Sequence, residues 1–255
     1  MYILTVGGLL ALFIIAPFSV SALWHEDKSS PRADQKGVCA RIIEYESRID
    51  PRFTEQQSRS NAREQSRARA LADHRAKADE WREKHRAVWN ERRDEHVKKL
   101  LERAQDETQR AAIIAFQEKA DAAVRTRHHA LDAAVRTFRE GVDATIQARK
   151  VVVRSATHVF EEAIRAAFDE AAADCKAGIG SETAKNALQN AIRAAREKLT
   201  AVRREIEKPK TSIETLITAR KDAFENTHQD FKAALEKARD ELKGVLGILV
   251  SSPDP

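Results

Sequence analysis

The chain contains few of the residues that break helices. Among its 255 residues there are 8 glycines and 6 prolines, and aromatic residues make up 5%. No glycine lies between Gly37 and Gly141, and no proline lies between Pro51 and Pro209. A β-rich domain needs turn residues at roughly every 8–12 positions, so this stretch excludes that class of domain. With so few large apolar residues, we expect a thin core lined by alanine and not a thick globular one.

Abundant alanine, arginine, glutamate and lysine favour long helices instead. Between Ile113 and Phe168, apolar side chains recur at steps of three, four and four residues. This eleven-residue (hendecad) repeat averages about 3.67 residues per turn, and such a narrow stripe packs helix against helix. The stripe consists of Ile113, Phe116, Ala120, Val124, Arg127, Leu131, Val135, Phe138, Val142, Ile146, Arg149, Val153, Thr157, Phe160, Ile164 and Phe168. The predicted fold is all-α, an elongated antiparallel long-helix bundle or coiled coil with hendecad repeats.

Residues 38–176 are predicted to hold a short helix and a long helical region. The short helix covers 38–49 and ends before Pro51, because proline disfavours the helical conformation in the residue that precedes it. The long region starts near Thr54. Two of its series have a spacing of eleven and are predicted to lie on a half-buried seam, together with Trp81. They are His74, His85 and His96, and Ala78, Trp89 and Leu100.

The stripe before residue 103 is offset by two residues from the stripe after residue 112. Two residues correspond to about 200° around a helix. A turn within 103–112 explains this offset, and so does a continuous helix that changes partners there.

A loop is predicted at 177–181, where Gly178 ends one helix and Ser181 caps the next. A C-terminal helical hairpin arm follows at 182–248 and is interrupted at Pro209, and residues 249–255 are predicted to be a disordered tail. The two packing stripes of this arm are Leu188, Ile192, Ala195, Leu199, Val202 and Ile206, and then Ile213, Ile217, Arg220, Phe224, His228, Phe231, Leu235, Arg239, Leu242 and Leu246.

Residues 2–24 contain no charged side chain. An apolar core followed by the small residues Val20, Ser21 and Ala22 is typical of a secretory signal peptide, here 1–22. The alternative is an uncleaved membrane anchor at 2–24, since about 20 apolar residues span a bilayer. Both interpretations place the rest of the chain in the cell envelope, in the periplasm or outside the cell, behind a flexible tether at 23–37.

The chain has two cysteines, Cys39 and Cys175. An even number in an exported chain predicts one disulfide, and the alternative is two unrelated buried thiols. A straight helix over 54–176 would extend for about 185 Å, whereas bridged cysteines need Cα atoms about 5.5 Å apart. An intramolecular bond therefore requires the long region to double back within 103–112.

Positive charge is concentrated in residues 52–99, which contain 14 lysines and arginines against 9 acidic residues. Arginine beside an aromatic residue is the combination that stacks on single-stranded nucleic acid, so this segment is a candidate surface for an anionic partner. The interleaved acids weaken a phosphate track and favour a solvated, salt-bridged helix face. The candidate residues are Arg75, Trp81, Arg82, Arg86, Trp89, Arg92 and Arg93.

No catalytic, cofactor-binding or metal-binding pattern stands out in the sequence. Eleven helical residues rise about 16.5 Å, so no two of the spaced histidines can share a metal ion on one helix. We therefore expect no enzymatic activity, no cofactor and no metal site.

Three segments resemble a group of uncharacterised exported Ala/Arg-rich long-helix proteins of candidate-phylum bacteria. They are VCARIIEYESRI (38–49), AAVRTFREGVDATI (133–146) and AAADCKAG (171–178). The resemblance covers residues 38–178, and it implies an exported helical protein without implying an activity. The architecture is more loosely similar to the basic, tentacled holdase chaperones of the periplasm and to the stalk subunit b of ATP synthases.

The expected function is that of an exported structural or interaction protein, an elongated helical spacer or binding scaffold in the cell envelope. The expected partner is a protein or a second copy bound through the helical seam, with membrane contact only through residues 2–24. The alternatives are a holdase-like chaperone for unfolded clients and binding of extracellular nucleic acid through residues 52–99.

Overall fold

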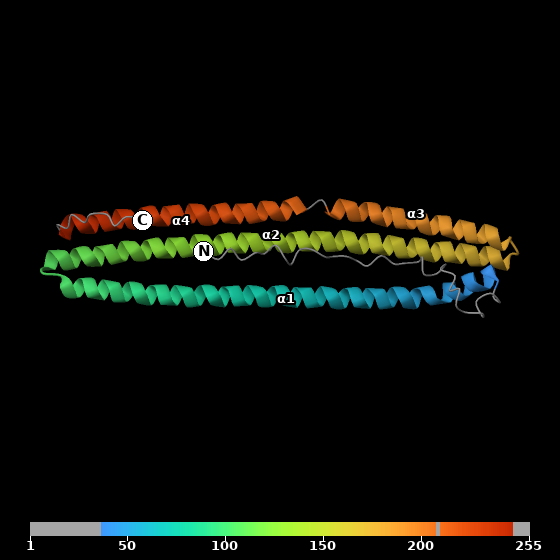
Figure 1. Ribbon diagram of the computed structural model, residues 1–255, viewed down its shortest axis with the longest axis horizontal. Coiled ribbons are helices and arrows are strands. Elements are labelled where there is room, and N and C mark those ends of the chain that lie inside the picture. The colour runs from blue at the N-terminus through green and yellow to red at the C-terminus, as the bar shows by residue number, and fades with distance from the viewer. Residues whose placement is uncertain (1–36, 208–209, 247–255) are drawn as a thin grey trace, which may run out of the picture. The chain divides into compact units, whose positions relative to one another are not determined.

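A computed structural model describes residues 37–207 and 210–246, and the chain is helical in nearly all of them. The helices are α1 (Val38–Arg103), α2 (Glu107–Lys176), α3 (Ser181–Glu207) and α4 (Lys210–Leu246), as Figure 1 shows. The all-α class is confirmed. The predicted signal peptide or anchor, the tether at 23–36, Pro209 and the tail at 249–255 lie outside the described residues.

The described chain forms two compact units. The first contains residues 38–72 and 158–199, and the second contains residues 73–157 and 200–246. In each unit, segments of α1 and α2 pack side by side in opposite directions, because only residues 104–106 connect the two helices. The third helical segment is α3 in the first unit and mainly α4 in the second.

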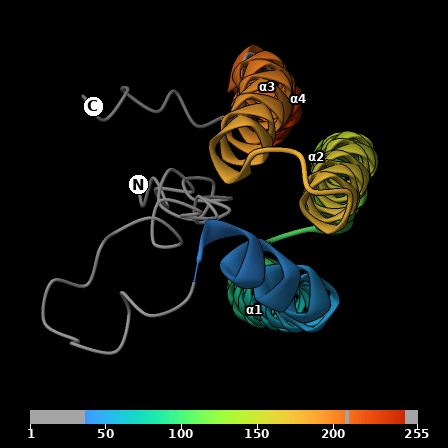
Figure 2. The same ribbon diagram turned by 90° about the vertical axis from the view of Figure 1, so that its right-hand side faces the viewer.

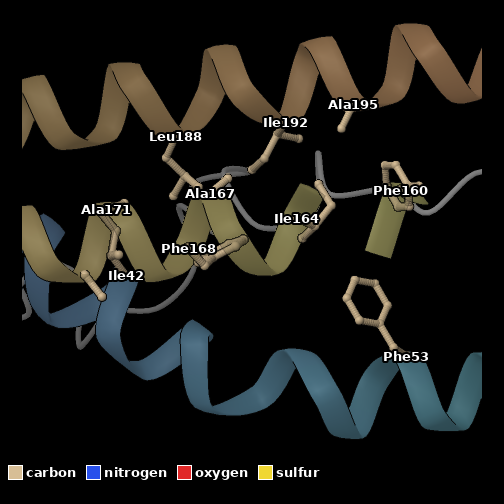
Figure 3. Close-up of a cluster of buried hydrophobic side chains, with 11 residues drawn as sticks. Ile42, Phe53, Phe160, Ile164, Ala167, Phe168, Ala171, Leu188, Ile192 and Ala195 are labelled. Atoms are coloured by element: carbon tan, nitrogen blue, oxygen red, sulfur yellow. The ribbon is translucent and has the colours of Figure 1, made fainter. Parts of the chain in front are cut away.

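In the first unit the core is a cluster of buried apolar side chains from three helices. Phe160, Ile164 and Phe168 of α2 lie between Phe53 of α1 and Leu188 of α3, as Figure 3 shows. Four of the cluster's buried members are alanines, and the partly buried Ala191 packs against it, which lets the helix backbones approach closely. The four are Ala167, Ala171, Ala172 and Ala195.

The predicted disulfide is present at the end of this core. Cys39 near the start of α1 is bonded to Cys175 near the end of α2, with the Cα atoms 5.4 Å apart. The bond requires α1 and α2 to run antiparallel, and the turn that reverses the chain lies at 104–106, inside the expected segment. A disulfide indicates an oxidising compartment.

The helix ends are explained by local hydrogen bonds. Gly178 has a φ of 80°, which glycine adopts without steric cost. The N–H of Gly178 donates to the carbonyl of Cys175, and the N–H of Ile179 donates to that of Asp174, so that α2 ends in a Schellman motif. At the start of α2, the carboxylate of Asp106 accepts a hydrogen bond of 2.8 Å from the N–H of Gln109.

The prediction that a short helix ends before Pro51 is wrong, because α1 continues through Pro51. An internal proline costs about 3 kcal/mol, and packing on both sides of it offsets that cost. Ile42 and Phe53 lie in the same core cluster. Between them, the carboxylate of Asp50 accepts a hydrogen bond of 2.6 Å from Arg165 of α2. Tertiary contacts here override the local preference of the sequence.

None of the sixteen residues of the packing stripe predicted on α2, from Ile113 to Phe168, is exposed. The stripe on α3 is likewise buried or half-buried. On α4 the prediction is wrong at Phe224, His228 and Arg239, which are exposed. The neighbouring small residues turn inward instead, and they let α4 lie close to α2: Ala223, Thr227 and Ala238.

Candidate functional site

The face of α1 that packs against α2 in the second unit is polar. A row of half-buried or buried positions follows steps of four and three residues, and most of them are charged: Arg75, Asp79, Arg82, Arg86, Asn90, Arg93, Val97 and Leu101. Only at the last two of these positions does an apolar core begin, where Val97 packs with Ile113 and Leu242. Contacts between α1 and α2 before that point depend on charge.

Four arginine–aspartate pairs join α1 to α2 in this unit, and together they are called the ion-pair ladder below. Arg75 donates two hydrogen bonds of 2.9 and 2.8 Å to Asp143. Arg86 does the same with Asp132, at 3.1 and 2.7 Å. Bidentate guanidinium–carboxylate pairs of this kind fix geometry as well as charge.

The third pair of the ladder has the opposite polarity, and the fourth is looser. Arg139 of α2 donates hydrogen bonds of 2.9 and 2.7 Å to Asp79 of α1, which also accepts one from Arg82 on its own helix. Nε of Arg93 lies 2.9 Å from a carboxylate oxygen of Asp121 without the alignment of a hydrogen bond.

Ion pairing in the ladder lowers the pKa of three of its aspartates and raises the pKa of two of its arginines. Hydrogen bonds from Arg86 hold the pKa of Asp132 below its usual value, and those from Arg139 and Arg75 do the same for Asp79 and Asp143. The pKa of Arg86 is raised, mainly by its hydrogen bonds to Asp132. These three carboxylates are therefore held in their charged form.

Three pairs of the ladder share one register. Moving eleven residues along α1, from Arg75 to Arg86, corresponds to moving eleven residues back along α2, from Asp143 to Asp132. A further eleven residues back lies Asp121, but its partner Arg93 lies only seven residues beyond Arg86, so the fourth pair departs from that register by four residues. A helix returns to nearly the same face after eleven residues, so the three aspartates form one row on α2.

A second interface in this unit joins α2 to α4, and α1 and α4 lie on different sides of α2 (Figure 2). The guanidinium of Arg127 lies 4.8 Å from the ring centre of Phe231, and that of Arg220 lies 4.2 Å from the ring centre of Phe138. Arginine over an aromatic face is a favourable cation–π contact. Burial at these contacts lowers the pKa of both guanidinium groups.

These two contacts also repeat after eleven residues, with the residue types exchanged between the helices. Arg127 and Phe138 are eleven residues apart on α2, and Phe231 and Arg220 are eleven residues apart on α4. At Gly141, α4 approaches so closely that a Cβ would lie 2.7 Å from Cδ2 of Leu216. This interface thus combines a fixed register with a close approach of the backbones.

The structure divides the predicted anionic-partner surface between two faces of α1. Arg75, Arg82, Arg86 and Arg93 are half-buried and ion-paired. The other three residues of that set are exposed: Trp81, Trp89 and Arg92.

The predicted histidine seam of α1 is wrong, since His74, His85 and His96 are exposed. Arginines lie at the inward positions, because their long side chains cover apolar surface while their guanidinium groups reach the aspartates. Asp121, Asp132 and Asp143 were not predicted as site residues. Their spacing of eleven was the signal that could have identified them.

Within residues 37–207 and 210–246, no group of three or more histidine, cysteine, aspartate or glutamate side chains is arranged to hold a metal ion. No helix in the described part of the chain is long and apolar enough to cross a membrane. No protein-family model, curated protein or solved structure matches the chain.

Proposed function

We propose that the protein is an exported helical spacer or binding scaffold that acts without catalysis. The ion-pair ladder is the observation that supports this most directly. An apolar seam holds two helices together but lets one slide along the other by a turn. Pairs that alternate between Arg–Asp and Asp–Arg prevent this, because a shift would place like charges opposite each other. A protein whose task is to hold two points at a set separation needs such a fixed register.

The sequence period supports the same function. We propose that the eleven-residue repeat keeps one kind of contact on each interface of α2 within the second unit. The row of aspartates and the exchanged arginine–phenylalanine contacts both follow it. A helix of 66 residues, the length of α1, rises about 100 Å. Such a length suits an elongated spacer.

Location follows from the disulfide and the N-terminal sequence. The Cys39–Cys175 bond favours an oxidising compartment. A cleaved signal peptide at 1–22, or an anchor at 2–24, together with this bond supports the proposal that the spacer lies in the cell envelope, in the periplasm or outside the cell.

A protein partner is part of the proposal. The stripe of α2 is covered by helices of the same chain. A partner or a second copy would therefore bind on exposed helix faces, unless the bundle opens. Recovery of proteins cross-linked to the chain in an envelope extract would identify it.

Solution scattering of the full chain tests the spacer. We expect the profile of a rod with the cross-section of about three helices, unchanged by added ligand. The charge reversal Asp132→Arg, which places like charges together, should change the profile. The matched reversal Asp222→Arg at an exposed position of α4 should not.

Two results would contradict this function. A compact particle would exclude a spacer. Suppression of aggregation of an unfolded client at stoichiometric amounts, with little dependence on salt, would favour the holdase-like chaperone instead, because burial of apolar surface is not screened by ions.

A further inference from the structure

One exposed face of α1 in the second unit carries two tryptophans. Trp81 is 58% exposed and Trp89 is 67% exposed. Side chains at steps of three and four residues share a helix face. The residues His74, Trp81, His85, Val88, Trp89, Arg92 and His96 therefore form one exposed stripe, called the tryptophan face below. Tryptophans this exposed on a folded helix mark an interaction site.

The tryptophan face contains no acidic residue, although acids are frequent in this part of α1. Several nearby acids pair with other cations. Asp79 pairs with Arg139, Glu80 with Lys84 and Glu83 with Arg86. Glu95, farther along the helix, pairs with Lys99. The tryptophan face itself thus contains Arg92 and no acid.

Arg92 is the main cation of the tryptophan face. Among residues 37–207 and 210–246 it has no ion pair. This distinguishes it from Arg86 and Arg93, which point to α2 and are bound by Asp132 and Asp121. Arg92 is thus free to contact an anion supplied by a partner.

The side chains of the face are almost all planar and are partly fixed in place. The rings of Trp81 and His85 stack with centroids 3.8 Å apart and planes tilted by 32°. Nδ1 of His85 also lies 2.8 Å from the carbonyl oxygen of Trp81, within hydrogen-bond distance. Fixed planar groups lose little conformational entropy when another planar group stacks on them.

We propose that the tryptophan face binds single-stranded nucleic acid. Bases stack on Trp81 and Trp89, which are separated by about 12 Å along the helix axis, and phosphates contact Arg92 and the histidines. Stacking on aromatic side chains beside cations is how proteins bind single strands with little sequence preference. This site is independent of the spacer function, because it uses none of the residues of the ion-pair ladder.

Two other occupants fit the face less well. A second copy bound through the same face would bring Arg92 close to the identical cation of that copy, which is unfavourable. An anionic membrane would insert long apolar side chains, whereas Val88 is the only aliphatic side chain of the stripe. Planar groups and positive charge together favour bases and phosphates.

The test measures binding of the full chain to a fluorescent oligothymidylate of about 20 nucleotides by anisotropy, at roughly 50 and 200 mM salt. We expect the double substitution Trp81→Ala/Trp89→Ala to weaken binding by on the order of tenfold or more for each tryptophan. Its matched control is Phe224→Ala, which removes an exposed aromatic side chain from α4. That control should leave the affinity unchanged.

A charge reversal tests the cation separately. Arg92→Glu should weaken binding and reduce its salt dependence. With one phosphate contact fewer, binding releases fewer counterions from the nucleic acid. Arg136→Glu changes the charge of the second unit equally at an exposed position of α2, and it should have a much smaller effect. Circular dichroism of each variant verifies that the helices are intact.

Several results would overturn the proposal. One is the absence of oligonucleotide binding at the lower salt concentration. Another is binding that survives the tryptophan substitutions, or that the two control variants weaken equally. Binding to vesicles of phosphatidylserine and phosphatidylcholine through the tryptophans, without oligonucleotide binding, would assign the face to a membrane. Association of the chain with itself that requires the tryptophans would assign it to a second copy.

Discussion

The pair between Arg86 and Asp132 offers the most direct test of the ion-pair ladder. Arg86 is 18% exposed and Asp132 is 37% exposed, and two hydrogen bonds of 2.7 and 3.1 Å join them. Replacing either residue by alanine leaves the other half-buried without its counter-charge. Each single variant should therefore unfold at a lower urea concentration than the original chain.

The magnitude follows from the degree of burial. Fully exposed ion pairs contribute about 0–1 kcal/mol, whereas removing one member of a buried pair costs about 3–5 kcal/mol. Asp132 is more than one third exposed, so solvent screens part of the attraction. We expect a coupling free energy of about 1–2 kcal/mol in the double-mutant cycle of Arg86→Ala and Asp132→Ala. The cycle cancels the helix propensity of alanine and the loss of the contact between Arg86 and Glu83.

Urea unfolding followed by circular dichroism and tryptophan fluorescence measures this coupling. In a Trp24→Phe background the remaining tryptophans, Trp81 and Trp89, both lie in the second unit. The control cycle uses Lys84 and Glu80, an exposed pair on the same helix with a comparable distance of 2.6 Å. If the coupling of Arg86 with Asp132 does not exceed that of the control, the ladder does not hold the register.

The same pair predicts a dependence on pH. Asp132 has its pKa lowered in the folded chain, chiefly by hydrogen bonds from Arg86. Its contribution to stability is therefore complete above the pKa of an unfolded aspartate, about 3.9. It is lost as the pH falls through the lower pKa of the folded state, because the unfolded chain binds the proton first. A coupling that grows on acidification would refute this assignment.

Three further predictions concern packing. Replacing Cys39 and Cys175 by serine should destabilise the first unit by about 5 kcal/mol in urea unfolding if chain entropy dominates, since 136 residues separate them. Gly141→Ala should not raise the Tm of the original chain, because the new Cβ would lie 2.7 Å from Leu216, but in a Leu216→Ala background it should stabilise by up to about 1 kcal/mol. Leu188→Ala should cost about 2–5 kcal/mol by urea unfolding, since Leu188 is 1% exposed in the first core.

The fold was predictable where large apolar side chains report the packing face directly. On α2, Phe138 and Phe160 lie on the stripe that faces the other helices, and hydrophobic periodicity is sufficient to identify it. The disulfide was predictable because an exported chain with two cysteines has one intramolecular pairing available. Pro51 shows the limit of local rules, because contacts of Asp50 and Phe53 with α2 stabilise a helix that the local sequence disfavours.

The packing face of α1 was not predictable in the same way. A search for apolar periodicity selects Trp81 and Trp89, whereas the face that meets α2 contains Arg75 and Arg86. Arginine is treated as a surface residue by such a search, because its burial is favourable only when a carboxylate lies opposite. The required partners, such as Asp132, lie on another helix. Only a comparison of the spacing of arginines in one segment with the spacing of aspartates in the other would have identified the ion pairs.

The candidate binding surface was underestimated because the charges were counted over a whole segment of the sequence. Acids interleaved through residues 52–99 weakened the prediction of a phosphate-binding track. In the second unit, aspartates of α2 engage the inward arginines, and exposed acids of α1 such as Glu80 and Glu95 pair with lysines of the same helix. The tryptophan face therefore exposes Trp81, Trp89 and Arg92 and contains no acidic residue of its own. A polyanion experiences the charge of the face it contacts and not that of the segment, since charges beyond about 8 Å are screened at physiological salt. Charge must therefore be counted for each helix face. A segment whose positive charges are nearly balanced by acids can still have one face that is cationic.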